Sequence, residues 1–185
     1  MNKELKRIIE SDCFRYYGNE KRPFLYKTRT KNLRYIICLR KASFYNDKRD
    51  IRKYYYKIKL RLMEKNSNFD ISINAKIGEG LYIAHKGTLV ISPYASLGKN
   101  IYFSASATVG MQNRGKNKGA PNIGDCVWIG ANAVIVGNVK IGDNVLIAPN
   151  AYVNFDVPDN SIVIGCPGVI KESKDATSGY IQNKV

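Results

Sequence analysis

The sequence contains one histidine, His85, within the segment GLYIAHKGTLVI. A neutral imidazole, whose pKa lies near neutrality, is the side chain best suited to take a proton from an alcohol. His85 is therefore a candidate general base, although a histidine exposed on a surface turn fits the same segment. A metal hydrolase would need about three imidazole ligands, so one histidine argues against a metal site.

Asp70 is the candidate partner of His85 and precedes it by fifteen residues. A carboxylate that contacts an imidazole fixes its tautomer and stabilises the imidazolium formed during catalysis. Asp70 would equally suit a capping or corner position where a new structural element begins. Which reading holds depends on whether the fold brings the two side chains together.

Large apolar residues recur at every sixth position through the C-terminal part of the chain. This period fits neither the 3.6 residues of a helical turn nor the alternation of an ordinary strand. It predicts a triangular solenoid, in which six residues form one short strand and one corner, and three such units form a coil. Asp70 and His85 then lie on neighbouring coils, although not directly above one another, and neighbouring coils are separated by about 4.8 Å. The three phased series are Ile71, Ile77, Ile83 and Leu89; Leu97, Phe103 and Val109; and Ile123, Ile129, Ile135, Ile141, Ile147 and Val153.

The corners of this solenoid are predicted from the small residues beside the apolar series. A small or β-branched residue stands four places after most members, where two walls of a narrow prism meet. Glycine or alanine often follows the member directly, because a tight corner of this kind leaves little room for a side chain or requires positive φ. The first set contains Ala75, Ala107, Val127, Ala133, Val145 and Ala151, and the second Gly78, Gly98, Gly124, Gly130, Gly142 and Ala148.

An inserted loop at residues 111–121 separates the second and third series. It is rich in glycine and carries Arg114, Lys116 and Lys118. This composition is typical of a surface insertion that the fold tolerates. It would also suit an arm that closes over an anionic, phosphate-bearing cofactor, so both interpretations stand.

Positive charge is concentrated in the N-terminal segment. Residues 1–70 carry 20 Lys/Arg against 8 Asp/Glu, a net charge of +12, whereas residues 71–185 carry 10 against 7, a net charge of +3. A helical cap over the open end of the solenoid is one explanation. Contact with an anionic membrane surface is another, since basic helices with interfacial tyrosines bind there. Nucleic-acid binding is less favoured, because no known nucleic-acid module accompanies the charge.

The same segment predicts three helices. The first covers residues 2–17 and ends at Gly18, and the second covers residues 30–43 after a polar connection at 19–29. Asp47 or Asp50 caps the third, which runs through residues 51–65. Its apolar face is predicted to contain Tyr54, Tyr55, Ile58, Leu60 and Leu62.

Composition places the protein in the cytoplasm. No apolar run approaches the roughly 20 residues that span a bilayer, and the N-terminus lacks the apolar core of a signal peptide. The four cysteines, Cys13, Cys38, Cys126 and Cys166, are scattered, so packed or surface thiols are expected rather than disulfides or a zinc site.

Several segments together resemble the serine acetyltransferase-like branch of the hexapeptide acyltransferases. They are GEGLYIAHKGTLVISPYASLGKN, SASATVG, PNIGDCVWIGANAVIVGNVKIGDNVLIAPNAYV, DVP and GCPG, within residues 69–170. The resemblance implies an all-β left-handed parallel β-helix of hexapeptide repeats after a short N-terminal α-helical segment. It also implies a homotrimer with active sites between subunits, acetyl-CoA as co-substrate and no metal. The expected divisions are a basic helical segment at 1–68, the β-helix at 69–164 and a tail at 165–185.

The resemblance also implies a set of site residues. His85 is the general base and Asp70 its partner, and an acetyl group passes directly from acetyl-CoA to an alcohol without an acyl-enzyme. Backbone N–H groups near Gly110 and Met111 hold the charge of the tetrahedral intermediate. The pantetheine arm passes Gly130, Ala131, Ala148 and Pro149, and the nucleotide end lies near Pro167 and Lys171.

Departures from the serine enzymes influence the expected acceptor. Ala84 stands where they have an acidic residue, residues 118–121 lack their Asp-Arg-His-Pro signature, and the tail ends in Val185 instead of isoleucine. Each lost charged hydrogen bond is worth about 1.5–3 kcal/mol. The sequence therefore predicts a sugar O-acetyltransferase for a surface polysaccharide or its precursor, held by the basic segment against the inner membrane face. The alternatives are a serine O-acetyltransferase of cysteine biosynthesis and a non-catalytic scaffold.

Overall fold

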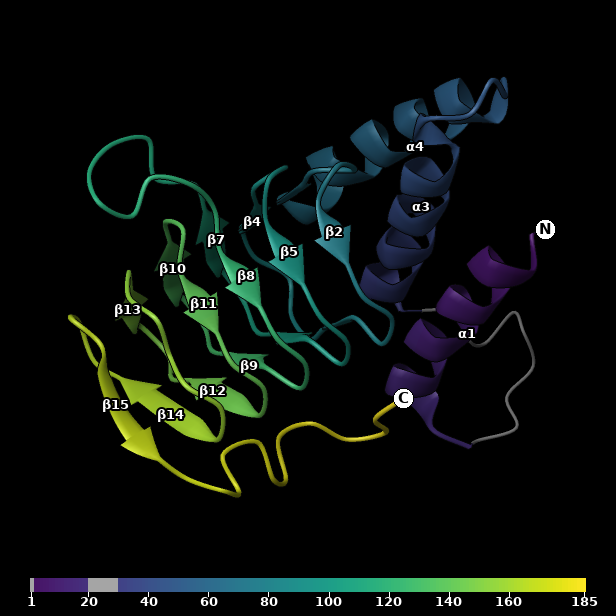
Figure 1. The fold of residues 1–185 in the computed structure, drawn as a ribbon. Helices are drawn as coiled ribbons and strands as arrows, with labels where there is room; N and C mark the ends of the chain where they lie inside the picture. The colour runs from purple at the N-terminus through teal and green to yellow at the C-terminus, as the bar shows by residue number, and fades with distance from the viewer. Residues whose placement is uncertain (1, 20–29) are drawn as a thin grey trace.

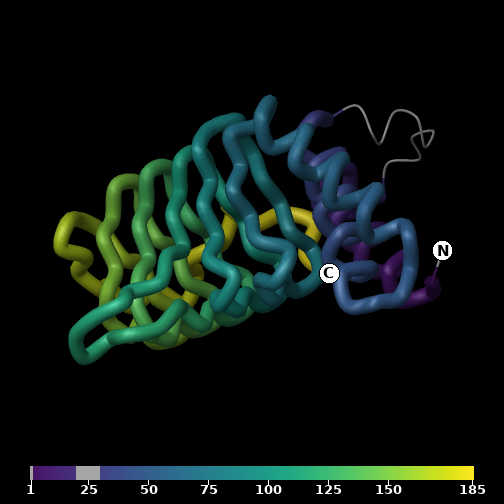
Figure 2. Tube along the Cα trace, turned by 90° about the horizontal axis from the view of Figure 1, so that it is seen from above, coloured from purple at the N-terminus to yellow at the C-terminus, as the bar shows by residue number. Residues whose placement is uncertain are grey.

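The protein consists of helices at one end of a parallel β-solenoid (Figure 1). The computed structural model describes residues 2–19 and 30–185, so almost all of the connection expected at residues 19–29 falls outside the described residues. Strands stack away from the helices, and the view from above shows successive coils of similar width (Figure 2). The hexapeptide period thus correctly predicted a solenoid behind a short helical segment.

Three helices are present in the described part of the chain, close to their predicted positions. They are α1 (Lys3–Tyr17), α3 (Lys31–Asn46) and α4 (Arg52–Ser67). Gly18, with φ of 55°, ends α1 as predicted. The Asp50 carboxylate accepts a 2.9 Å hydrogen bond from the Arg52 backbone N–H at the start of α4. None of these described helices has both the length and the apolar character needed to cross a bilayer.

The strands form three walls, here called sheets A, B and C. Sheet A contains β1 (Phe69–Ile71), β4 (Leu89–Ile91), β7 (Thr108–Gly110), β10 (Val134–Val136) and β13 (Tyr152–Val153). Sheet B contains β2 (Lys76–Ile77), β5 (Ser96–Leu97), β8 (Asn122–Ile123) and β11 (Lys140–Ile141). Sheet C contains β3 (Tyr82–Ile83), β6 (Tyr102–Phe103), β9 (Trp128–Ile129), β12 (Val145–Ile147), β14 (Ser161–Ile164) and β15 (Val169–Glu172). All pairings are parallel except β14 with β15.

The apolar series fills the core, with one shift of register. Ile71 lies beside Ile91, and Ile91 beside Val109. The first coil therefore advances by 20 residues and the second by 18, so Ile91 takes the stacking place predicted for Leu89. Ile83 pairs with Phe103, which is also an advance of 20 residues. The two extra residues must consequently lie between β3 and β4, in the corner that contains His85.

Of the two reasons predicted for the corner glycines, the lack of space for a side chain is confirmed and positive φ is not. Gly98, Gly124 and Gly142 do not have positive φ; the residues two positions further on, Asn100, Cys126 and Asn144, do. These glycines are needed for space, because a Cβ on Gly98, Gly124 or Gly142 would lie 2.2 Å from an aspartate oxygen. That aspartate caps the neighbouring coil: Asp143 Oδ1, for example, accepts a 2.6 Å bond from the Asp125 N–H. Asparagine suits the left-handed positions because its short polar side chain tolerates them.

The helices cover the first coil, as the capping hypothesis predicted. Tyr35 of α3 packs edge-on against Phe69 of β1, with ring centroids 5.0 Å apart, and Leu60 of α4 is buried in the same core. The predicted apolar face of α4 was wrong in part. Only Leu60 of its five expected members is buried; the others, Tyr54, Tyr55, Ile58 and Leu62, are exposed.

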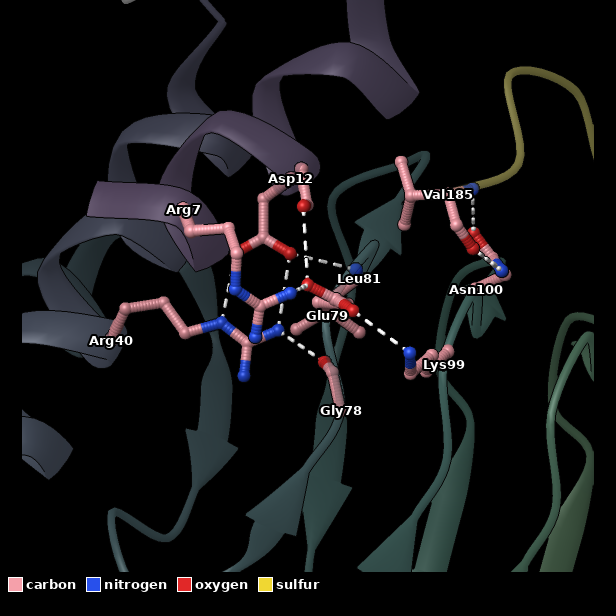
Figure 3. A network of polar contacts seen from close by, with 10 residues as sticks. Arg7, Asp12, Arg40, Gly78, Glu79, Leu81, Lys99, Asn100 and Val185 are labelled. Atoms are coloured by element: carbon pink, nitrogen blue, oxygen red, sulfur yellow. Dashed lines mark hydrogen bonds and ion pairs between the residues drawn. The ribbon is translucent and has the colours of Figure 1, made fainter. Parts of the chain in front are cut away.

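Buried charges attach α1 to α3 and to the solenoid (Figure 3). Asp12 of α1 is fully buried and accepts hydrogen bonds from Arg40 of α3 at 2.8 and 3.1 Å. It also accepts one from the Leu81 N–H at 2.8 Å. Beside this pair, Glu79 contacts Arg7 of α1 and Lys99 of the next coil. Charged side chains thus fix the angle at which the helices meet the first coil.

The tail returns along sheet C toward the helices, so the end of the chain lies near α1 (Figure 1). Thr177 Oγ1 contacts Asn144 Oδ1 at 2.6 Å, and the Tyr180 ring lies 5.1 Å from that of Trp128. Asn100 exchanges two 2.8 Å hydrogen bonds with the Val185 backbone. The tail therefore covers much of the outer face of sheet C.

Candidate active site

His85 lies on the edge where sheet C turns into sheet A. It comes two residues after the end of β3 and lies in the corner that the register shift makes two residues longer than the corner between β6 and β7. The side chain is exposed in the single chain. A longer corner lifts a residue out of the stacked wall, so this edge presents the imidazole to any molecule bound along it.

Asp70 lies on the outer face of β1, beside Val90 of β4. The strand that follows the His85 corner is thus the direct neighbour of the strand that carries Asp70, which matches the adjacency expected from the repeat. Both side chains are exposed, and within the described residues no ion pair joins them. The pairing of Asp70 with His85 stays a prediction.

Two neighbouring groups, the partly exposed Glu64 and the buried Tyr35, respond to the charge of Asp70. Desolvation is the main cause that raises the pKa of Glu64, and the negative charge of Asp70 raises it further. Desolvation also raises the pKa of Tyr35, with contributions from Glu64 and Asp70. Asp70 therefore stands at the junction of α3, α4 and β1, where any bound cation or imidazolium would be favoured.

Most of the residues assigned to the cofactor lie on the same edge as His85. Gly130 and Ala131 follow β9, Ala148 and Pro149 follow β12, and Pro167 follows β14, all of which belong to sheet C. These corners stack directly, as the 2.9 Å bond from the Asn150 N–H to the Ala131 carbonyl shows. Gly130 is explained by this stacking alone, because a Cβ there would lie 2.5 Å from the Pro149 nitrogen.

The remaining assigned residues are elsewhere in the protomer. Gly110 and Met111 end β7 and begin the inserted loop, at the edge between sheets A and B. Lys171 lies on β15, beside Ile162 of β14. A single chain therefore does not gather the proposed base and the proposed oxyanion donors. Only a second protomer could bring an A–B edge to the C–A edge of the first.

The inserted loop is a short hairpin that extends from the solenoid (Figure 2). Gln112 and Gly119 pair across it with hydrogen bonds of 2.8 and 2.9 Å. Asn117 anchors it, since its side chain donates to the Asn154 carbonyl at 2.5 Å and its carbonyl accepts from the Asn138 N–H at 2.9 Å. Its three cationic side chains, Arg114, Lys116 and Lys118, are exposed.

A cationic cleft beside the His85 edge was missed by the sequence reasoning. It has a volume of about 320 Å³ and is lined in part by Lys31, Arg34 and Lys86. Lys86 follows His85 directly, which was the available signal. Lys31 and Arg34 come from α3, and only the packing of α3 on the first coil brings them there. The cleft offers cations for an anionic group close to the candidate base.

A hexapeptide solenoid that carries a histidine and small residues on the edge between sheets C and A is typical of one class of acyltransferases. Comparison with known proteins agrees with this assignment. Residues 120–154 match the family described as bacterial transferase hexapeptide (six repeats). Serine acetyltransferase of Staphylococcus aureus strain Mu50 is 38% identical over 104 residues, which cover 56% of this chain and 49% of that protein. The Staphylococcus epidermidis strain RP62A enzyme is 36% identical over 123 residues, covering 64% and 58%. The chain thus spans about half the length of the curated relatives it matches.

Solved structures extend the likeness to the helical segment. Neisseria gonorrhoeae serine acetyltransferase in complex with serine is 31% identical, with a TM-score of 0.73, over 91% of this chain and 69% of that one. The chain belongs to the serine acetyltransferase-like branch of the hexapeptide-repeat acyltransferases.

The expected sugar acceptor was wrong. Curated and solved relatives are named serine acetyltransferases, and nothing among them supports a role in polysaccharide synthesis. That expectation rested on Ala84 and residues 118–121, where the charged groups of the serine enzymes are missing. Lys31, Arg34 and Lys86 come together in one cleft only in the folded chain.

Proposed function

We propose that this protein is an acetyl-CoA-dependent O-acetyltransferase whose acceptor is the hydroxyl group of serine. The likeness to a solved serine acetyltransferase with serine bound, over 91% of this chain, is the observation that carries the proposal. The position of His85 on the same edge as Gly130, Ala131 and Pro149 supports it. The cleft lined by cations supplies partners for the carboxylate of an amino acid.

In the proposed reaction, His85 removes the proton from the serine hydroxyl while the serine oxygen attacks the thioester carbonyl carbon of acetyl-CoA. The tetrahedral intermediate places a negative charge on the former carbonyl oxygen. Backbone N–H groups at Gly110 and Met111 of a neighbouring protomer stabilise that charge. The carbon–sulfur bond then breaks, the thiolate takes the proton from the His85 imidazolium, and O-acetylserine and coenzyme A leave.

Asp70 acts in this scheme as a positioning residue that orients the imidazole and favours its protonated form. No cysteine takes part, because the acetyl group passes directly to the acceptor. Ala131, Ala148 and Pro149 form the wall along which pantetheine lies. Pro167 lies at the end of that wall, and the cationic Lys171 on the adjoining strand β15 suits a phosphate of the nucleotide. The active assembly is a homotrimer.

The function is tested by following thiol release from acetyl-CoA with serine as acceptor. His85→Asn should lower kcat by about 10²–10⁴-fold with a small change in KM, because the loss of a general base affects the transition state. Absence of serine-dependent thiol release in the native protein would refute the proposal. Full activity of His85→Asn would refute the assignment of the base.

The cleft is tested by pairing serine with serinamide, which lacks the carboxylate. Lys86→Ala should lower kcat/KM for serine by about tenfold or more, the value of a charged hydrogen bond, and leave serinamide almost unchanged. Lys140→Ala, on the outer face of sheet B, is the matched control. Equal losses for both acceptors would remove Lys86 from carboxylate binding.

We also propose that α4 contacts an anionic membrane surface. Ile51, Tyr54, Ile58 and Leu62 form an exposed row at helical spacing. Cationic side chains, among them Lys57 and Arg61, share the helix. An apolar row beside cations suits the interface of an anionic bilayer.

Co-sedimentation with phosphatidylserine-containing vesicles tests this contact. Binding should weaken as salt is raised and should fall in Ile58→Ser, which removes a side chain 64% exposed on α4. Tyr94→Ser is the matched control, since Tyr94 is 72% exposed on the solenoid. If Ile58→Ser binds vesicles like the control, α4 does not make the contact.

A further inference from the structure

A cavity of about 380 Å³ lies between α1, the outer face of sheet C and the tail. None of the residues assigned to acetyl transfer lines it. Its volume is within the range of small-molecule sites, which also combine apolar walls with a few polar groups. The residues that line it are Arg15, Tyr16, Tyr82, Tyr102, Trp128, Gly179, Tyr180, Gln182 and Asn183.

Arg15 is the only charged residue in this lining, and it is only 4% exposed. Its Nε donates a 3.1 Å hydrogen bond to the Gly80 carbonyl. In the part of the chain that the structure describes, no carboxylate pairs with Arg15, and no oxygen accepts a hydrogen bond from its two terminal nitrogens. A guanidinium has five N–H donors, so most of its binding capacity is unused.

The other buried arginine shows what a structural role looks like in this protein. Arg40 pairs with the Asp12 carboxylate and donates to the carbonyls of Ile77 and Gly78. A buried cation normally has such a counter-charge, because burying an uncompensated one destabilises the fold. Arg15 lacks this compensation and faces a cavity. An anion bound there would supply it.

Aromatic rings form the walls around Arg15. Neighbouring centroids are 4.2 Å apart for Tyr16 and Tyr82, 5.0 Å for Tyr82 and Tyr102, and 5.6 Å for Tyr102 and Trp128. Tyr180 of the tail closes this row at 5.1 Å from Trp128. Arg15 also lies over the Tyr82 ring, 5.7 Å from its centroid. Such walls favour flat, apolar groups.

We propose that this cavity binds a small carboxylate that carries a flat aromatic ring. The carboxylate accepts hydrogen bonds from the terminal nitrogens of Arg15, which match its two oxygens. The ring lies against Trp128 and Tyr180. A monocarboxylate fits better than a phosphate dianion, because one guanidinium is the only cation in the lining and the tyrosines would leave a second negative charge unmatched.

Trp128 gives a direct measurement, because it is the single tryptophan of the chain. 3-Phenylpropionate should change its fluorescence saturably. 3-Phenylpropionamide, which has the same shape without the charge, should bind at least about tenfold more weakly, since it loses a charged hydrogen bond. The readout does not use acetyl transfer, so it stands apart from the proposed function. No saturable change, or equal affinity for acid and amide, would overturn the proposal.

Two variants locate the site. Arg15→Gln can keep the bond to Gly80 and should weaken 3-phenylpropionate binding by about tenfold or more, whereas Lys140→Gln, on the outer face of sheet B, should not. Unchanged affinity of a folded Arg15→Gln protein, checked by circular dichroism, would contradict the assignment. If Arg15→Gln fails to fold, Tyr180→Ala decides: it removes a half-exposed wall from the tail, and binding must weaken.

Discussion

At the scale of single residues, burial separates the charged groups that hold the fold from those that serve the candidate site. Asp12 and Arg40 are buried and bonded to each other and to backbone. His85, Asp70 and Lys86 are exposed in the single chain. The buried charges stabilise one arrangement of α1, α3 and the first coil. The exposed charges are available to a ligand or a neighbouring subunit.

The first prediction concerns Asp12. Asp12→Ala leaves the Arg40 guanidinium buried without its counter-charge, so the free energy of unfolding should fall by about 3–5 kcal/mol. Urea unfolding at a fixed protein concentration measures this loss. Glu10→Ala is the control, because Glu10 and Lys6 form an exposed pair at 3.7 Å and such pairs contribute about 0–1 kcal/mol. A similar loss in both variants would show that the buried pair contributes no more to the free energy of unfolding than the exposed pair.

At the scale of elements, the sequence predicted what depends on spacing and missed what depends on packing. The hexapeptide period located the strands because each inward residue repeats a local pattern. The shift from Leu89 to Ile91 remained hidden, since both are apolar and only the pairing distinguishes them. The exposed face of α4 was misjudged because Leu60 and Ile58 are equally apolar, and only the position of the first coil decides which is covered.

Part of the candidate site could likewise be predicted from the spacing of residues, and part depends on packing. The residues that follow strands of sheet C could be aligned along one edge from the repeat alone, and Gly130, Ala148 and His85 lie there. The cleft with Lys31 and Arg34 could not be predicted, because it forms where a helix meets the solenoid. The acceptor was corrected by the serine acetyltransferase relatives, not by a pattern in the sequence.

The second prediction concerns the link between α1 and the solenoid. A hydrogen bond from Lys99, followed by the charge of Arg7, holds the pKa of Glu79 below its ordinary value. A carboxylate with a lowered folded-state pKa stabilises the fold fully above its unfolded pKa of about 4.3. That stabilisation disappears as the pH falls through the lower, folded-state value. The Tm of the native protein should therefore fall below about pH 4.3 partly through Glu79.

Glu79→Gln removes this titration while keeping a side chain of the same size. The difference in Tm between the native protein and Glu79→Gln should be largest near neutrality and should shrink as acid is added. Differential scanning calorimetry across that pH range measures it. A difference that stays constant with pH would show that Glu79 does not contribute through its charge.

At the scale of the whole molecule, the three outer faces of the solenoid have different characters. Sheet C is covered by the tail through Tyr180. Sheet B presents exposed polar side chains, among them Lys76, Asn122 and Lys140. The outer face of sheet A presents a partly exposed and mostly apolar column beside Asp70, which contains Val90, Thr108, Val134 and Tyr152. Apolar surface of this kind favours association, and the proposed site needs a second chain to bring Gly110 near His85.

The third prediction therefore concerns sheet A. Val134→Lys places a charge in the middle of its outer column, between Thr108 and Tyr152, and should prevent subunits from associating. Light scattering should then report a mass near the 20.8 kDa of one chain. Thiol release from acetyl-CoA should be lost as well, although His85 is intact, because the oxyanion donors would come from the missing neighbour. Asn122→Lys adds the same charge to sheet B and should change neither property. A Val134→Lys protein that keeps the native mass would place the subunit contact on another face, and one that is monomeric yet fully active would mean that each chain contains a complete site.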